Sequence, residues 1–332
     1  MMKINILITA IGCNNSISVM KGLKLLKKER FKIIGTDIYD QNEIPGVIFC
    51  DKVYKVPTYN NKAFIDVLLE ICKKEKIFFL IPIVDQEVEI ISKYKDKFEK
   101  LGVRVCCSNY KTNNICNDKY KTYVYLKGKN IVTPRVYLPN EIDEIKKILP
   151  PYFIKPRKGR SSMDCYKANS FKELEVFLKK VKDPIIQEVL KGEQYVIDVI
   201  NDLEGRNLVS IPRHEILAKA GIGVKAKTIR DLKLIQYGQK ISEAIGINGT
   251  ANIEVFKDKE KISLIEINPR FSAGAIISII SGINIPEIII DVFLNKKIGL
   301  DRLKWAENIY MARYWQEVFF HKKKLLNVKY DI

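Results

Sequence analysis

The sequence has 332 residues, 47% of them hydrophobic and 29% charged, with a formal net charge of +18. A chain of this length and composition holds about two or three domains with hydrophobic cores, which excludes a disordered protein. Its apolar runs are far shorter than the roughly 18 residues of a membrane-spanning helix, and no small-residue cleavage site follows the apolar N-terminus, so we expect a cytoplasmic protein with no membrane partner.

The positive charge raises the question of a nucleic-acid partner. Most of the 57 basic residues are lysines scattered along the whole chain, whereas nucleic-acid surfaces cluster their charge and favour arginine. We therefore expect a solvated lysine-rich surface and no nucleic acid, with an anionic small molecule as the next candidate. The seven cysteines form no C-x-x-C pair, and with two histidines no zinc spacing arises, so we expect free cysteines in a reducing compartment.

Strands and helices alternate over residues 3–106. We expect strands at 3–10, 31–36, 53–56, 78–83 and 104–106, with helices over 16–28, 62–74 and 85–101. This order predicts a doubly wound parallel sheet. The turn after the first strand has Gly12 but no further glycines of a G-x-G-x-x-G motif. Although Asp37 resembles a ribose-binding acid, we interpret this sheet as a scaffold whose strand ends face another domain.

The pattern changes after residue 109. We expect helices over 114–128, 141–149, 171–181 and 228–245, and strands at 152–156, 184–189, 193–201, 206–213, 250–257 and 261–267. Several of these strands look antiparallel, because short turns join them. The glycine-containing segment 218–227 lacks strong periodicity and is interpreted as a loop around an acceptor substrate.

Acidic and amide side chains stand on two strands near the end of this region. Glu254 lies in one strand, and Glu266 and Asn268 lie two residues apart, hence on one face, in the next. If the strands pair across their connecting turn, three oxygen ligands of the kind that Mg²⁺ prefers converge, and Arg270 follows for a phosphate. Solvent-facing acids on a hairpin are the other interpretation, which the apolar neighbours in the second strand weaken.

A second group of residues suggests phosphate binding. Lys155 stands in an apolar strand, and a buried lysine needs an anion. The turn that follows has a glycine, two serines and three basic residues, which suits closure over phosphates, although it is not a Walker loop. The strand at 184–189 stops before Gly192, where its edge could offer backbone groups to an adenine and Glu193 could accept ribose hydroxyls.

In this order the features resemble the ATP-grasp superfamily, and more narrowly the short proteins related to the carbamoyl-phosphate synthase large subunit and biotin carboxylase. The resemblance covers nearly the whole chain, and its most specific elements are N-I-E at 252–254 and E-I-N-P-R at 266–270. It implies an α/β Rossmann-like pre-ATP-grasp domain over 1–112, followed by a two-lobed α+β ATP-grasp fold. The small lobe with a linker helix is expected over 113–186, and the large lobe with the Mg-ATP and acceptor site over 187–332.

The resemblance also implies roles for individual residues. The nucleotide phosphates would be bound by Lys119, Lys155 and the flexible loop of Gly159, Arg160, Ser161 and Ser162. The adenine and ribose would be bound by Glu188, Val189, Leu190 and Glu193. Mg²⁺, or Mn²⁺ in its place, would be held by Glu254, Glu266 and Asn268, and the catalytic residues would be Arg270, Arg213 and Lys155. Family loops often have glycine where this chain has Met163 or Asp164.

The implied function is an ATP-dependent carboxylate–amine or carboxylate–ammonia ligase, which forms an amide through an acyl phosphate and releases ADP and phosphate. Its partners would be a small anionic carboxylate and an amine or ammonia donor, and we expect a homodimer, the commonest assembly of soluble enzymes. His214 is more simply structural than a base for the amine. Two alternatives stay open: an enzyme that activates bicarbonate or carbamate, as carbamoyl-phosphate synthase does, and a non-catalytic ATP-binding module.

Overall fold

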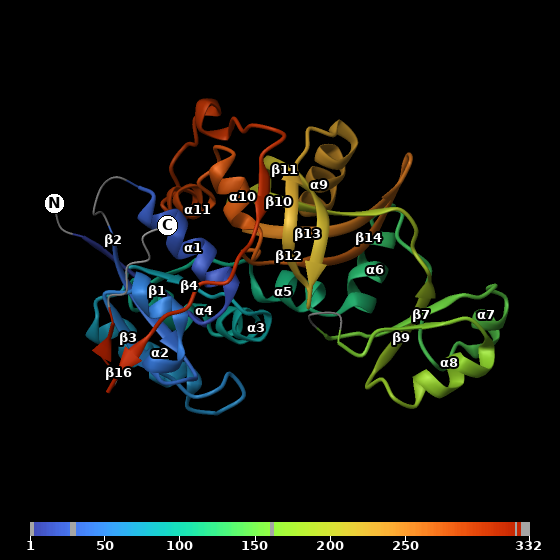
Figure 1. Cartoon of the computed structure of the whole chain (residues 1–332), viewed down its shortest axis with the longest axis horizontal. Coiled ribbons are helices and arrows are strands. Elements are labelled where there is room, and N and C mark those ends of the chain that lie inside the picture. Colours follow the sequence, from blue (N-terminus) through green and yellow to red (C-terminus); the bar gives the residue numbers. More distant parts are fainter. Residues whose placement is uncertain (1–2, 27–30, 160–162, 323, 327–332) are drawn as a thin grey trace.

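The computed structural model describes residues 3–26, 31–159, 163–322 and 324–326. Its main strands form three sheets that follow one another along the chain, of five, four and six strands. In Figure 1 the six-stranded sheet lies between the N-terminal sheet and the four-stranded sheet. Within the described residues, no helix has the length and apolar character needed to cross a bilayer.

The N-terminal sheet has the strand order β3-β2-β1-β4-β5, and all of its pairings are parallel. Its strands are β1 (Ile4–Ile8), β2 (Phe31–Asp37), β3 (Lys52–Lys55), β4 (Phe79–Ile81) and β5 (Arg104–Val105). Its helices are α1 (Asn14–Lys24), α2 (Phe64–Lys74), α3 (Asp85–Lys93) and α4 (Lys95–Glu99). The predicted doubly wound sheet is confirmed, but the single helix expected over 85–101 is wrong, because the chain breaks at Tyr94 into α3 and α4.

Alternation along β1 places its side chains in two hydrophobic cores. Ile6 and Ile8 pack with α1 on one face of the sheet, whereas Leu7 packs with α2 and α3 on the other. The α1 core also contains residues of two helices from the far end of the chain, α10 (Ala275–Ile280) and α11 (Ile285–Phe293). The approach is close: a Cβ added at Gly22 of α1 would lie 2.9 Å from the side chain of Ile279. The N-terminal sheet is therefore packed against the C-terminal part of the chain.

Two helices lead from the first sheet to the second. The single helix expected over 114–128 is in fact α5 (Tyr110–Cys116) and α6 (Lys119–Lys127). The break follows from Asp118, whose extended backbone and side chain cap the N-terminus of α6 by accepting a hydrogen bond from the Lys121 amide. Arg157 donates to the same carboxylate through Nη2 at 2.6 Å, which ties α6 to the end of β7 (Tyr152–Pro156).

The four-stranded sheet is antiparallel and has the order β6-β9-β7-β8. Besides β7, it consists of β6 (Val136–Tyr137), β8 (Tyr166–Ala168) and β9 (Pro184–Glu188). The helices α7 (Ile142–Lys146) and α8 (Phe171–Leu178) bury Ile145 and Leu174 against Tyr152, Ile154 and Ile186. Because alternate residues of a strand point to opposite faces, Lys155 faces away from this core.

The six-stranded sheet is antiparallel and has the order β14-β13-β10-β11-β12-β15. Its strands are β10 (Glu193–Asn201), β11 (Asn207–Lys219), β12 (Ile222–Thr228), β13 (Gly249–Asp258), β14 (Lys261–Asn268) and β15 (Tyr310–Ala312), and α9 (Leu232–Ile245) packs on it. The loop expected at 218–227 is wrong: β11 and β12 form a hairpin through that segment, turning at Ala220 and Gly221. Its bulged register, between Glu215 and Ala218, conceals the strand periodicity.

A buried ion-pair network joins β10 and β11 to the chain after β14. Arg213 is only 2% exposed and donates to Asp198 at 2.5 Å and to Glu215 at 2.7 Å. Asp198 also accepts hydrogen bonds from Ser272 and Ser278, at 2.9 and 2.7 Å. Removal of the aspartate would leave a buried guanidinium without its main counter-charge.

We therefore expect Asp198→Ala to lower the free energy of unfolding by about 3–5 kcal/mol, the usual effect of breaking a buried ion pair. Urea unfolding measures this change. The control is Glu144→Ala, which removes an exposed partner of Lys147 and should cost less than about 1 kcal/mol. A similarly small effect for both variants would contradict a structural role for the Asp198–Arg213 pair.

Candidate functional site

Two glutamates face each other on neighbouring strands. Glu254 of β13 and Glu266 of β14 are direct partners in the antiparallel register, and Asn252 is the partner of Asn268. The Asn268 amide nitrogen donates to Glu254 Oε1 and to Glu266 Oε1, at 3.2 Å each. The pairing across the hairpin that the sequence suggested is thus present, and it brings the three expected metal ligands together.

The two carboxylates differ in their electrostatic surroundings. Burial raises the pKa of Glu254, and the neighbouring charge of Glu266 raises it further. Burial also opposes ionisation of Glu266, but Lys119 and Lys155 outweigh it and lower the pKa of this carboxyl. The site therefore stabilises one negative charge with two lysines and holds a second carboxyl group that lacks a counter-charge of similar strength.

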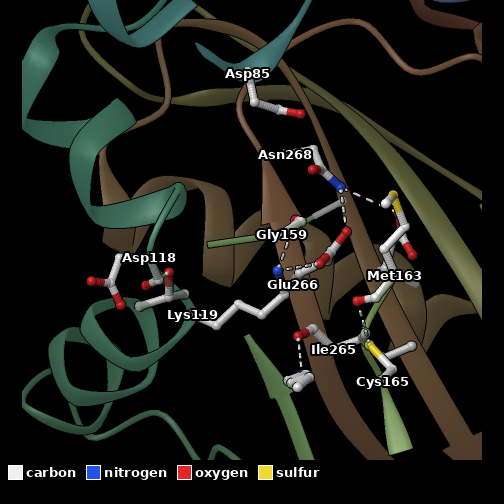
Figure 2. Close-up of polar contacts among 12 residues, drawn as sticks. Asp85, Asp118, Lys119, Gly159, Met163, Cys165, Ile265, Glu266 and Asn268 are labelled. Atoms are coloured by element: carbon white, nitrogen blue, oxygen red, sulfur yellow. Dashed lines mark hydrogen bonds and ion pairs between the residues drawn. The ribbon is translucent and has the colours of Figure 1, made fainter. Parts of the chain in front are cut away.

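Lys119 connects this carboxylate pair to the loop after β7. Lys119 is the first residue of α6. Its Nζ lies 3.0 Å from Glu266 Oε2 and donates a hydrogen bond to the Gly159 carbonyl at 3.2 Å. Figure 2 shows Lys119, Gly159, Glu266 and Asn268 pointing toward one another. A cation, two carboxylates and a loop backbone therefore meet at one place.

Lys155 approaches the same group from the small sheet. It is 3% exposed, and its Nζ donates to Tyr123 Oη at 3.1 Å and to the Ile265 carbonyl at 3.3 Å. Burial, reinforced by the charge of Lys119, lowers its pKa to about 8. Its partners are neutral groups, so its charge is only partly compensated until an anion binds.

Arg270 follows the strand and lies beside Asn268. Its Nη2 donates to Asn268 Oδ1 at 3.2 Å, and its Nε and Nη2 donate to both carboxylate oxygens of Asp85, at 2.9 and 3.1 Å. Asp85 is the first residue of α3, so the N-terminal domain contributes directly to the site. In Figure 2 it lies beyond Asn268.

A pocket of about 550 Å³ opens beside these residues. Its walls come from the N-terminal domain and from the region around the carboxylate pair. They are formed by Tyr59, Asp85, Gln86, Glu89, Ile90, Lys93, Tyr110, Cys116, Asn117, Lys119, Lys158, Gly159, Glu266, Ile267 and Asn268. Pockets of this size accommodate small molecules, and this one reaches the expected metal ligands.

The expected adenine and ribose residues lie where the chain passes from the small to the large sheet. Glu188 ends β9, Val189 and Leu190 follow half-buried, and Glu193 begins β10. Gly192 has a φ of +101°, and a Cβ there would lie 2.1 Å from the Lys257 carbonyl, so this turn requires glycine. Glu193 is exposed and accepts a hydrogen bond from Tyr195 at 2.8 Å.

Part of the expected phosphate loop cannot be placed. Arg160, Ser161 and Ser162 lie outside the described residues, while Gly159 touches Lys119 on one side. On the other side, Asp164 has a φ of +54°, in the left-handed region that favours glycine. The chain thus uses a glycine-like conformation at a position where the family often has glycine.

Two expected residues do not line the pocket. Arg213 is enclosed in the Asp198 network described above and is not among the pocket residues. The His214 ring lies tilted against the Tyr195 ring, with centroids 5.0 Å apart, and its Nε2 lies 3.6 Å from Glu193 Oε2.

The sequence did not indicate three polar residues that shape the site. Asp85 pairs with Arg270, Tyr123 binds Lys155, and Asn252 accepts a hydrogen bond from Asn268 at 3.2 Å. Tyr123 stands four residues after Lys119 on one helix face, and Asn252 two residues before Glu254 on one strand face, so spacing could have suggested both. Asp85 opens a helix after a core strand, which by itself indicates only a favourable helix start.

Comparison with known protein families agrees with this architecture. Residues 116–274 match the ATP-grasp domain, and residues 6–106 match the PylC-like N-terminal domain. The chain therefore carries an ATP-grasp domain, as the resemblance seen in the sequence implied, and the domain that precedes it is PylC-like. Enzymes with this domain use ATP and Mg²⁺.

Individual relatives point to the same class of ligases. The carbamoyl phosphate synthase large chain of Clostridium acetobutylicum is 24% identical over 86% of this chain, but the match covers only 29% of that protein. The D-alanine–D-alanine ligase of Fusobacterium nucleatum is 26% identical over 51% of this chain and 61% of its own length. The chain thus spans less than a third of the carbamoyl phosphate synthase that it matches.

Solved structures share the fold. The biotin carboxylase domain dimer of 2-oxoglutarate carboxylase from Hydrogenobacter thermophilus, in complex with MgADP and bicarbonate, superposes with a TM-score of 0.76 at 15% identity, over 93% of this chain and 74% of that one. The L-amino acid ligase from Bacillus licheniformis gives a TM-score of 0.68 at 17% identity, over 88% and 74% of the two chains.

The donor set fits a divalent cation bound with nucleotide. Carboxylate and amide oxygens are the ligands that Mg²⁺ prefers, and nucleotide phosphates commonly complete its coordination. Among the described residues no three His, Cys, Asp or Glu side chains form a metal cluster; Glu254 and Glu266 offer two carboxylates, and the Asn268 amide lies between them.

Lys155 predicts an unusual pH dependence of nucleotide binding. Since its pKa in the ligand-free protein is about 8, the affinity for MgADP should fall as the pH rises from 7 to about 9.5, because the lysine loses the charge that attracts phosphate. Isothermal titration calorimetry measures this change. Lys155→Gln should bind more weakly at pH 7 and lose the dependence; an unchanged slope in this variant would contradict the assignment.

The same shift has the opposite effect on stability. The folded-state pKa of Lys155 lies below the ordinary value of 10.5, so the unfolded chain binds this proton more tightly. The free energy of unfolding should therefore rise with pH between about 8 and 10.5, as the folded protein is relieved of the buried charge. Urea unfolding at several pH values measures this rise. The Lys155→Gln variant has no amine to titrate and should lack this part of the rise.

Proposed function

We propose that the protein is an ATP-dependent ligase that joins a small carboxylate to an amine or to ammonia. The observation that carries this proposal is the convergence of Glu254, Glu266 and Asn268 with Lys119 and Lys155 beside a pocket. The ATP-grasp domain supports the use of ATP, and relatives that are ligases support the type of reaction.

In the first step, a carboxylate oxygen of the substrate attacks the γ-phosphorus of ATP. An acyl phosphate forms, the bond from the γ-phosphorus to the bridging oxygen breaks, and ADP leaves with that oxygen. Lys119 and Lys155 would hold the phosphates, since both are close enough to Glu266 to lower its pKa. Arg270 is positioned beside Asn268 to stabilise the transferred group. Catalysis of this kind depends mainly on positioning and on electrostatic stabilisation.

In the second step, the amine attacks the acyl carbon and phosphate leaves, which yields the amide and releases a proton. The pocket between α3 and the carboxylate pair is large enough for the substrate. Glu254, Glu266 and Asn268 would hold Mg²⁺, which would neutralise charge on the phosphate oxygens. The loop that begins at Arg157 and Lys158 would exclude water that otherwise hydrolyses the acyl phosphate.

Three expectations from the sequence extend the proposal. Glu188, Val189, Leu190 and Glu193 would bind adenine and ribose; they lie where the chain connects the four-stranded to the six-stranded sheet. A homodimer is part of the proposal, since the matched biotin carboxylase domain is described as a dimer. Arg213 would act as a catalytic residue beside the acceptor, with its guanidinium held by Asp198 and Glu215.

A phosphate-release screen across carboxylate–amine pairs tests this function, with mass spectrometry of the products. We expect one class of pairs to give an amide, ADP and phosphate in equal amounts. Glu266→Gln should lower kcat by about 100-fold or more, because a charged metal ligand is lost. Glu260→Gln is the matched control: it lies on the same hairpin but is 73% exposed and should leave kcat unchanged.

The screen also separates the alternatives. Phosphate release that depends on bicarbonate and not on any other carboxylate would favour a bicarbonate-activating enzyme. Nucleotide binding without turnover under any acceptor would favour a non-catalytic module. Full activity of Glu266→Gln at saturating substrates would contradict the assignment of the metal ligands.

A further inference from the structure

Arg270 is held by the N-terminal domain as well as by its own strand. Asp85 grips the guanidinium side-on, with Nε–Oδ1 and Nη2–Oδ2 distances of 2.9 and 3.1 Å. This pair spans 185 residues of sequence, and both side chains are mostly buried, with exposed fractions of 16% for Arg270 and 23% for Asp85. Such bidentate pairs fix the orientation as well as the charge of a guanidinium.

The other donors of Arg270 are also largely engaged. Nη2 donates a second hydrogen bond to Asn268 Oδ1, and Nη1 donates to the Phe271 carbonyl, at 3.2 Å each. Within the described residues these contacts account for four of the five N–H groups of the guanidinium. One N–H on Nη1 is left for an incoming oxygen, on the guanidinium whose Nη2 contacts the Asn268 amide.

We propose that Asp85 is a positioning residue for phosphoryl transfer. It holds the Arg270 guanidinium in one orientation, so that the remaining N–H binds an oxygen of the transferred phosphoryl group. This inference rests on the proposed function for the identity of the transferred group. It gives the N-terminal domain a part in the chemistry, whereas no motif in that domain suggested one.

The interface does not need Asp85 for its cohesion. Asn15 donates to the Phe271 carbonyl and Ser18 to the Ala273 carbonyl, at 2.8 Å each, so two other hydrogen bonds tie α1 to the same loop. Residues of α10 and α11 pack in the α1 core as well. What Asp85 supplies is a carboxylate from the N-terminal domain that pairs directly with the Arg270 guanidinium.

The test compares Asp85→Asn with the matched control Ser18→Ala. Calorimetry measures the affinity for the magnesium complexes of ADP and of AMPPNP, a non-hydrolysable ATP analogue. The ratio of the AMPPNP affinity to the ADP affinity reports how much the γ-phosphate contributes to binding. We expect Asp85→Asn to lower this ratio about tenfold and to leave the ADP affinity nearly unchanged, because only the orientation of Arg270 is lost. Ser18→Ala should keep the wild-type ratio, and Asp85→Glu, which restores the charge, should recover part of it.

Turnover and a double mutant complete the test. With an active substrate pair, Asp85→Asn should lower kcat about tenfold or more while the KM for ATP changes little. Adding Asp85→Asn to Arg270→Gln should have no further effect on the ratio, since the two residues act as a unit. Thermal unfolding of each variant shows whether it is folded.

The inference is overturned if Asp85→Asn keeps the wild-type affinity ratio, if Ser18→Ala lowers it equally, or if the two substitutions are additive. Its failure differs from failure of the proposed function. A wild-type protein that ligates no carboxylate–amine pair contradicts the function, while the affinity ratio still decides the role of Asp85. A wild-type protein that binds neither nucleotide overturns both.

Discussion

The structure of the site depends on the electrostatic repulsion between two carboxylates, Glu254 and Glu266, that lie side by side and partly buried. Glu254 and Glu266 are direct register partners, so the sheet itself keeps them together. Like charges at this distance raise the pKa of at least one group, unless cations compensate. Lys119 and Lys155 compensate for Glu266, and the amide of Asn268 bridges to Glu254. A divalent cation bound with nucleotide would compensate both carboxylates, which explains why the protein places them side by side.

Each part of the chain contributes to satisfying this constraint. The hairpin of β13 and β14 supplies the carboxylates, the small sheet supplies Lys155, and the start of α6 supplies Lys119. The N-terminal domain holds Arg270 through Asp85. The site therefore combines residues from all three parts of the chain, and none of the three forms it alone. The packing of α10 and α11 against α1 holds the first sheet in place against the C-terminal part of the chain.

Much of this arrangement follows from local rules that can be applied to the sequence. Strand alternation placed Glu266 and Asn268 on one face, and a short turn implied that Glu254 would be opposite. A lysine within an apolar strand predicted the buried Lys155, which is 3% exposed. The parallel sheet was predictable because strands and helices alternate with regular spacing.

Other features depend on contacts between distant parts of the chain. Asp85 meets Arg270 across 185 residues, so no local spacing relates them. The break between α5 and α6 follows from Asp118, whose capping role is reinforced by Arg157 of another element. The long hairpin of β11 and β12 is bulged, and its outer half is exposed, so its side chains do not alternate between apolar and polar. The periodicity of apolar residues predicts helices and strands because it follows which face of an element is buried. It no longer predicts them where a neighbouring domain determines which side chains are buried.

The central claim is that Glu254, Glu266 and Asn268 hold a divalent cation together with ATP. A crystal structure of the protein with ADP and Mn²⁺, with anomalous diffraction to locate the ion, tests it most directly. The account predicts an anomalous peak within bonding distance of both glutamates, with the phosphates of ADP next to Lys119 and Lys155. Bound nucleotide with no ion at the two glutamates, or an ion bound elsewhere in the chain, would contradict it.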